Sequence, residues 1–268
     1  MLRATMSAGI LLFSASQLNF SESIQIMTIQ ARTSSGQKAM LKGIPIFKAD
    51  NAILYTVPIM AVDLDGAPNA YHPPTPGHPH GKGPGLGLED LRNASRNLDD
   101  GPNAQWVGIV TDKQGKPIIQ TEGPFTGFYV SKTSLEDRRF AIEDPRRYAD
   151  ATKIPYVVLN PILRRNAGVD LGDLAAVVLD SPNHEISFGI VADIGPSKGL
   201  GECSKALANS INRPNGTEGT NITYVFFPNR DGRRIRTREQ IINEAQALFA
   251  AWGGLGRVQS LADSSEDR

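Results

Sequence analysis

Two carboxylic residues nine positions apart, Asp193 and Glu202, have side chains suited to acid–base chemistry on a glycosidic bond. That reaction needs a proton for the leaving oxygen and a carboxylate that attacks the sugar or activates water. Two carboxyl groups supply both when their surroundings separate their pKa values. On spacing alone, this pattern is more typical of two structural residues, an Asp that forms a turn and a Glu in the first turn of a helix, than of a catalytic pair.

The segments around the two residues predict how they are presented. Asp193 follows the apolar segment 185–192, which predicts a strand, and Gly195-Pro196 then turns the chain, so its side chain should lie at a barrel rim. We expect Glu202 to open a helix that ends near Ser210. A helix N-terminus stabilises an ionised Glu by ~0.3–1 kcal/mol. Glu202 would therefore need burial, or repulsion from Asp193, to keep a proton.

Short strands separated by turn residues make up most of the predicted elements, which favours a small barrel or sandwich, mainly β with a few helices. Pro58 predicts an edge or a break in the first long strand. The predicted strands are 24–29, 52–62, 105–111, 117–120, 127–131, 156–159, 174–179, 185–192 and 221–227. The predicted helices are 88–95, 201–210 and 237–252, the last capped by Thr237.

The domain organisation follows from composition along the chain. Residues 1–40 are polar and serine-rich and predict a leader or an N-terminal arm, 41–254 predict the main domain, and 255–268 predict a polar, frayed tail. Arg3, a short apolar patch at 9–13 and small residues after it have the order of a signal peptide, although the apolar patch is short. We expect a secreted or periplasmic protein.

Overall composition excludes several classes of partner. Lys and Arg balance Asp and Glu at 28 each, so no basic surface for nucleic acid is indicated. No apolar run approaches the ~20 residues of a membrane span. Cys203 is the single cysteine, so no internal disulfide can form, and a lone thiol is more typical of a core residue than of a nucleophile.

An ordered series of segments gives the two carboxyl groups more weight. The run 62–73, with Asp-Gly-Ala-Pro-Asn-Ala-Tyr at its centre, resembles the signature of the fungal-type chitosanases, glycoside hydrolase family 75. Further segments follow in that family's order: Leu91–Ala94, Trp106–Thr111, Gly127–Leu135, Ile154–Leu159, Gly172–Leu174, Val191–Pro196 and Gly201–Ser204. The resemblance covers roughly residues 55–254.

The resemblance implies an endo-acting, inverting hydrolase of chitosan with a double-psi β-barrel. Its catalytic Asp and Glu fall on Asp193 and Glu202. In inverting enzymes such groups stand ~6.5–9.5 Å apart with a water between. We assign Glu202 as the general acid and Asp193 as the base, with the reverse assignment open. We expect a monomer that needs no cofactor.

A polycationic substrate implies further carboxylates along the binding groove. Asp63 and Asp65 are candidates for contact with the substrate, and Tyr71 and Trp106 for stacking against sugar rings. A turn around Gly66 or a calcium site is the alternative for the two Asp residues, and a core position is the alternative for the two rings. The loop histidines 72, 78 and 80 lack a firm scaffold, and we expect no metal site.

Three departures from the family pattern bear on the substrate. The secretion signal is weak, the Pro/His/Gly-rich loop 73–85 is long, and the C-terminal part is rich in arginine. Two other functions therefore stay open. One is cleavage of peptidoglycan, which other double-psi barrels carry out, some with a single Asp. The other is glycan binding without catalysis.

Overall fold

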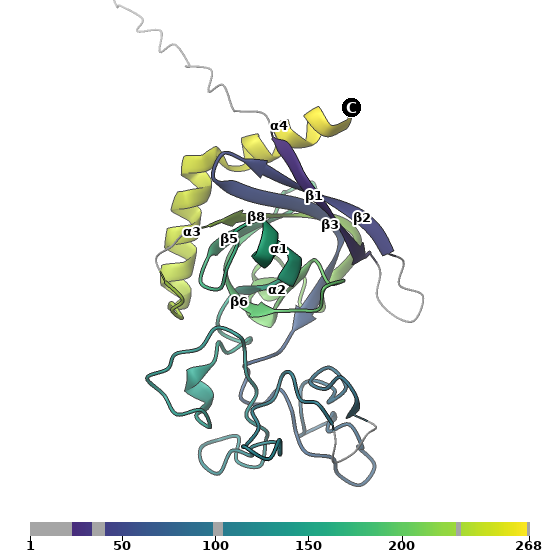
Figure 1. The fold of residues 1–268 in the computed structure, drawn as a ribbon, viewed down its shortest axis with the longest axis vertical. Helices are drawn as coiled ribbons and strands as arrows, with labels where there is room; N and C mark the ends of the chain where they lie inside the picture. The colour runs from purple at the N-terminus through teal and green to yellow at the C-terminus, as the bar shows by residue number, and fades with distance from the viewer. Residues whose placement is uncertain (1–22, 34–40, 99–103, 229–231, 267–268) are drawn as a thin grey trace, which may run out of the picture.

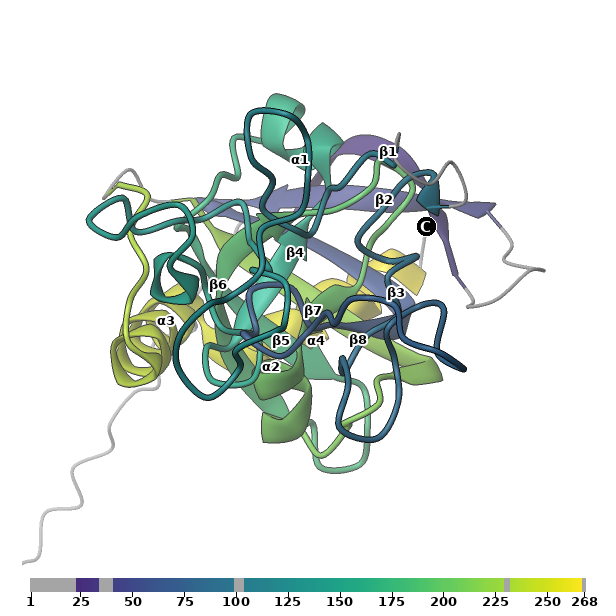
Figure 2. The same cartoon turned by 90° about the horizontal axis from the view of Figure 1, so that it is seen from below.

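The computed structural model describes residues 23–33, 41–98, 104–228 and 232–266. The fold is mainly β with a few helices, as the sequence predicted, and the described residues form a closed six-stranded barrel and four α-helices. A lobe of loops and turns, roughly residues 64–98 and 104–153, hangs from one end of the barrel (Figure 1). Figure 2 views the molecule from below, with these loops in front of the strands.

The barrel closes because β3 pairs with strands on both of its sides. Its six strands run in the order β3, β7, β4, β6, β5 and β8, and β8 returns to β3. The pairs β3–β7 and β4–β6 are parallel, and the other pairs are antiparallel. The strand bounds are β3 Ala52–Asp63, β4 Tyr156–Leu159, β5 Leu174–Leu179, β6 Ile186–Ile194, β7 Glu202–Ser204 and β8 Thr217–Phe227.

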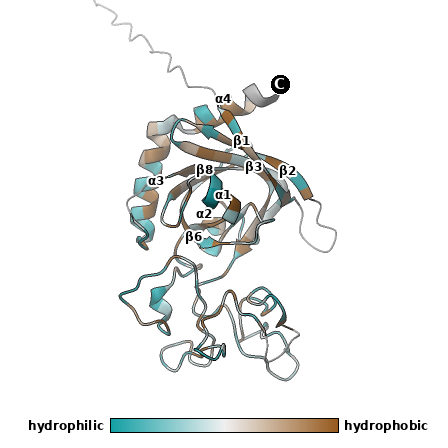
Figure 3. Cartoon of the chain, viewed as in Figure 1, coloured by the Kyte–Doolittle hydropathy of each residue, from teal (hydrophilic) through white to brown (hydrophobic). Residues whose placement is uncertain are grey.

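Apolar side chains fill the barrel and explain why the sequence identified five of its six strands, all but β7. All residues of β4 and β5 are buried, and both strands have the predicted bounds. Figure 3 shows the apolar colouring concentrated on the strands. Proline cannot donate to a sheet ladder. Accordingly, the β3–β8 pairing shifts register between Val57 and Ile59, on either side of Pro58.

Two further strands extend the barrel sheet beyond β3. Strand β1 (Ile24–Arg32) pairs antiparallel with β2 (Leu41–Ala49), which pairs antiparallel with β3. The predicted strand at 24–29 is therefore present, and it lies within the stretch predicted as an arm. The predicted signal segment lies outside the described residues.

Two expectations for the lobe were only partly met. The predicted helix 88–95 is wrong, because this segment forms turns that bury Leu91 and Ala94 while Leu88 stays exposed. The predicted strands 105–111, 117–120 and 127–131 occur only as isolated bridges, such as Ile109 with Ser131. Gly- and Pro-rich turns keep these segments too short for regular ladders.

The described residues form four α-helices: α1 Pro161–Asn166, α2 Lys205–Ser210, α3 Arg238–Trp252 and α4 Gly254–Glu266. Helix α3 packs on β5 and β6. The expected frayed tail is wrong, since α4 is helical and its Val258 is buried in a cluster with Phe249 and Trp252. Within the described part of the chain, no helix has the length and apolarity of a membrane span.

Thr237 caps helix α3, as the sequence predicted, and it forms a capping box with Gln240. The Thr237 hydroxyl accepts from Gln240 N, and the Gln240 side chain accepts from Thr237 N. We expect Thr237→Ala to lower the free energy of unfolding by ~1 kcal/mol, because an orphan N–H of the helix loses its acceptor. Urea denaturation measures this, with Thr237→Ser as the control that keeps the hydroxyl. Equal stability of the Ala variant and the wild type would contradict the assignment.

Candidate active site

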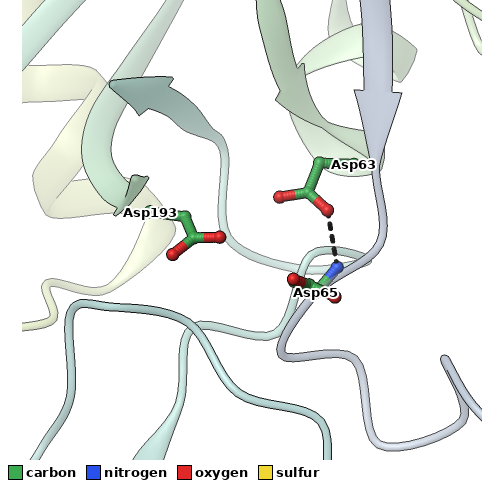
Figure 4. Close-up of side chains that lie close together, drawn as sticks. All are labelled: Asp63, Asp65 and Asp193. Carbon is green, nitrogen blue, oxygen red and sulfur yellow. Dashed lines mark hydrogen bonds between the residues drawn. The ribbon is translucent and has the colours of Figure 1, made fainter. Parts of the chain in front are cut away.

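Three strands deliver carboxyl groups to the end of the barrel that carries the lobe. Asp63 is the last residue of β3, Asp193 lies one residue before the end of β6, and Glu202 is the first residue of β7. The parallel pairing of β3 with β7 places Ala61 opposite Glu202. Asp65 follows in the loop after β3. Figure 4 shows Asp63, Asp65 and Asp193 turned toward a common space.

These residues line a cavity of about 510 Å³ between the barrel end and the lobe. Its wall contains carboxyl groups from five residues: Asp63, Asp65, Glu89, Asp193 and Glu202. Arg96, from the lobe, is the cationic residue in the same wall. Asp63, Asp65, Asp193 and Glu202 are each half-buried. A ligand can therefore reach the cavity, but water screens the charges of its carboxyl groups poorly.

Asp63 and Asp65 are fixed by the turn that follows β3. Asp65 N donates to Asp63 Oδ1 at 2.9 Å, and the Tyr156 hydroxyl donates to Asp63 Oδ2 at 2.9 Å. The Tyr71 hydroxyl donates to Asp65 Oδ1 at 2.7 Å. Burial and the charge of Asp193 together raise the pKa of Asp63 to about 7. Burial, then the charge of Asp63, raises the pKa of Asp65 well above its usual range.

Only glycine fits at residue 66 of this turn. Its φ is +79°, and a Cβ there would lie 2.2 Å from the carbonyl oxygen of Ala149. Gly66 N donates to the buried hydroxyl of Ser131 at 2.9 Å. The pair Asp65-Gly66 therefore joins β3 to the lobe, and its tight turn fixes the positions of Asp63 and Asp65.

The Asp193 carboxyl group is bonded by a residue of the lobe. Ser134 donates to its Oδ1 twice, from the backbone N at 2.8 Å and from the hydroxyl at 2.6 Å. Burial raises the pKa of Asp193, but these bonds, the backbone of Ile194 and the charge of Lys132 oppose the rise. Donors of this kind favour the ionised form.

Glu202 has a different environment, and its predicted position was wrong. It lies in β7 and not at a helix start, because Ser204 caps α2, which begins only at Lys205. No hydrogen bond to its carboxyl group is formed by the described residues. Burial, then the charges of Asp63 and Asp193, raises the pKa of Glu202 to about 8. The expected dipole effect is thus absent, and Glu202 retains its proton near neutral pH.

The two aromatic candidates occupy different places. Tyr71 is only 1% exposed and has no free ring face for a sugar, so we revise its expected role to holding Asp65. Trp106 is half-buried against Tyr129, with ring centroids 6.0 Å apart, and is not part of the cavity wall. The structure therefore brings both predicted catalytic residues, both predicted aspartates and Tyr71 to one cavity wall, but not Trp106.

The loop histidines make local contacts. The ring nitrogens Nδ1 of His72 and His78 lie 2.8 and 3.0 Å from backbone carbonyl oxygens, and His80 Nδ1 lies 3.5 Å from Asp90. Asp63, Asp65 and Asp193 each offer an oxygen within 4.8 Å of the others, a spacing that suits a cation. Three such oxygens fall short of the six to eight that calcium takes.

Sequence reasoning missed four residues of the site: Glu89, Arg96, Ser134 and Tyr156. Glu89 lies in the segment 88–95, which was wrongly predicted as a helix, and Arg96 directly follows it. Ser134 and Tyr156 lie inside segments of the recognised series, which was the available signal. Their contacts with Asp193 and Asp63 span 59 and 93 residues, and local patterns carry no information on such pairings.

No protein-family model and no curated protein matches the chain significantly.

The cavity carboxyl groups make stability depend on pH. The folded pKa of Glu202, about 8, lies above its ordinary value of 4.5, so between these values the folded state binds more protons than the unfolded state. Stability from this group is therefore complete at acidic pH and is lost as the pH rises through 8. Glu202→Gln should raise the free energy of unfolding at pH 8.5 by ~1 kcal/mol or more, since one pKa unit corresponds to ~1.4 kcal/mol.

Thermal or urea unfolding at pH 4 and pH 8.5 measures this effect, with little gain expected at pH 4. Glu185→Gln is the control, because Glu185 is bonded to Ser181 away from the cavity and its pKa is lowered. A Glu202→Gln variant that is less stable at pH 8.5 than at pH 4, relative to the wild type, would contradict the raised pKa.

Proposed function

We propose that the protein is an endo-acting glycoside hydrolase that cleaves the β-1,4 glucosamine linkages of chitosan with inversion. The observation that carries the proposal is the unequal environment of two carboxyl groups in one cavity. Asp193 receives hydrogen bonds that favour its charge, whereas Glu202 receives none from the described residues and has a pKa near 8. Such a pair provides an acid and a base at the same pH.

The roles follow from these environments. Protonated Glu202 transfers its proton to the glycosidic oxygen as the bond from that oxygen to the anomeric carbon breaks. Ionised Asp193 takes a proton from a water whose oxygen bonds to the same carbon from the opposite face. After product release, exchange with solvent returns a proton to Glu202 and removes one from Asp193. The working pH should lie between the two pKa values.

The charge of the cavity supports a cationic sugar polymer. Five carboxyl groups against Arg96 give a negative field in a poorly screened space, which attracts glucosamine ammonium groups. Bringing an ammonium group beside Asp63, Asp65 or Glu89 also relieves the repulsion that raises the pKa values of the aspartates. An uncharged chitin chain has no such compensation.

The resemblance to glycoside hydrolase family 75 supports the same assignment, because its signature run forms the end of β3 and the turn that holds Asp63 and Asp65. The closed barrel with its two parallel pairs is consistent with the double-psi topology of that family. Secretion and a monomeric state belong to the proposal on the same ground.

Asp193→Asn and Glu202→Gln should each lower the rate of chitosan cleavage by ~10²-fold or more, because each removes one partner of the proton transfers. A reducing-end assay on chitosan, chitin and peptidoglycan measures this. Asp112→Asn and Glu122→Gln, both on exposed turns, serve as matched controls that should keep wild-type activity.

The same assay separates the other functions. Full activity of either cavity variant on chitosan would end the proposal. Peptidoglycan cleavage that survives Glu202→Gln and releases anhydro-sugars would indicate a lytic enzyme. Polymer binding by the wild type without new reducing ends would indicate a glycan-binding protein.

A further inference from the structure

Ser134 occupies a particular position relative to Asp193. It lies on the lobe, 59 residues before Asp193 in the chain, and contributes both its backbone N–H and its hydroxyl to Oδ1. The next residue, Leu135, donates its N–H to the carbonyl oxygen of Ala192 at 2.8 Å. The segment 134–135 is thus fixed against the end of β6, through the carbonyl oxygen of Ala192 and the side chain of Asp193.

Two donors on one oxygen make the two oxygens of Asp193 unequal. Both Ser134 donors bond Oδ1 from the lobe side, and neither of them bonds Oδ2. Asp193 lines the cavity together with Glu202, so the remaining oxygen is the one available to a ligand there. For an inverting reaction that ligand is water, and its direction is set by the fixed plane of the carboxyl group.

The surroundings of Asp193 explain why such donors are needed. Asp63 at the end of β3, Asp65 in the next loop, Glu89 on the lobe and Glu202 on β7 share its cavity and disfavour a further negative charge. Tyr71 and Tyr156 direct their hydroxyls to Asp65 and Asp63 and not to Asp193. Lys132 and Arg96 are the nearby cations, and Lys132 lowers the pKa of Asp193 less than the bonds from Ser134 do.

We propose that Ser134 is a positioning residue that keeps Asp193 ionised among its neighbouring carboxyl groups and leaves Oδ2 to hold the attacking water. The role of the water rests on the proposed function, but the effect on ionisation does not. Ser134 is exposed and its segment keeps the backbone bond of Leu135 when the hydroxyl is removed, so the fold should tolerate substitution.

The test compares Ser134→Ala with Ser134→Thr, which keeps a hydroxyl. We expect the Ala variant to raise the pKa of Asp193 by about one pH unit, the size of a hydrogen bond to a charged group. Carbon-13 NMR titration of Asp193 measures this without any substrate. In the pH profile of kcat/KM on chitosan, the apparent pKa of the acidic limb should rise by the same amount. At the pH optimum, kcat should fall ~10-fold and KM should stay within twofold.

Ser134→Thr should restore both the apparent pKa of the acidic limb and kcat. Ser181→Ala should change neither value, because this variant removes a Ser–carboxylate bond away from the cavity. An unchanged Asp193 pKa in Ser134→Ala, or an equal loss of activity at every pH that Thr does not restore, would overturn the proposal. Full activity of Asp193→Asn would instead overturn the proposed function, and the NMR titration would still decide the role of Ser134 in ionisation.

Discussion

Repulsion between carboxyl groups at the barrel end is the constraint on which the rest of the site depends. Asp63, Asp65 and Asp193 offer oxygens within 4.8 Å of one another, and Glu202 and Glu89 line the same cavity. In a space with little water, this many carboxyl groups cannot all be ionised at neutral pH. Protons must remain on some of them, and the surrounding donors decide on which.

The fold distributes those donors unevenly. Tyrosines 71 and 156 and the backbone of Asp65 bond the aspartates of the β3 turn, and Ser134 bonds Asp193, while Glu202 receives no comparable donor from the described residues. Closing the barrel brings β7 between β3 and β4, which places Glu202 beside the charges of its neighbours. The strand order and the lobe together therefore give Asp193 and Glu202 different surroundings in one cavity.

Regular, buried segments could be predicted from sequence, and the site could be predicted only in part. Apolar runs identified β4 and β5 with the right bounds, and Pro58 marked the irregularity in β3. The strand at Glu202 was missed because three residues after a glycine give no periodicity. The environment of Asp193 was missed because Ser134 lies 59 residues away, and only tertiary pairing of lobe and barrel brings the two together.

With Glu202 as the acid and Asp193 as the base on water, the most direct consequence is the face from which water attacks the anomeric carbon. Proton NMR of the anomeric signals during digestion of a fully deacetylated chitosan hexamer reports it. We expect α-anomers of the new reducing ends to appear first and then to mutarotate, because water attacks a β-linkage from the opposite face. Initial release of β-anomers, or of anhydro-sugars, would contradict it.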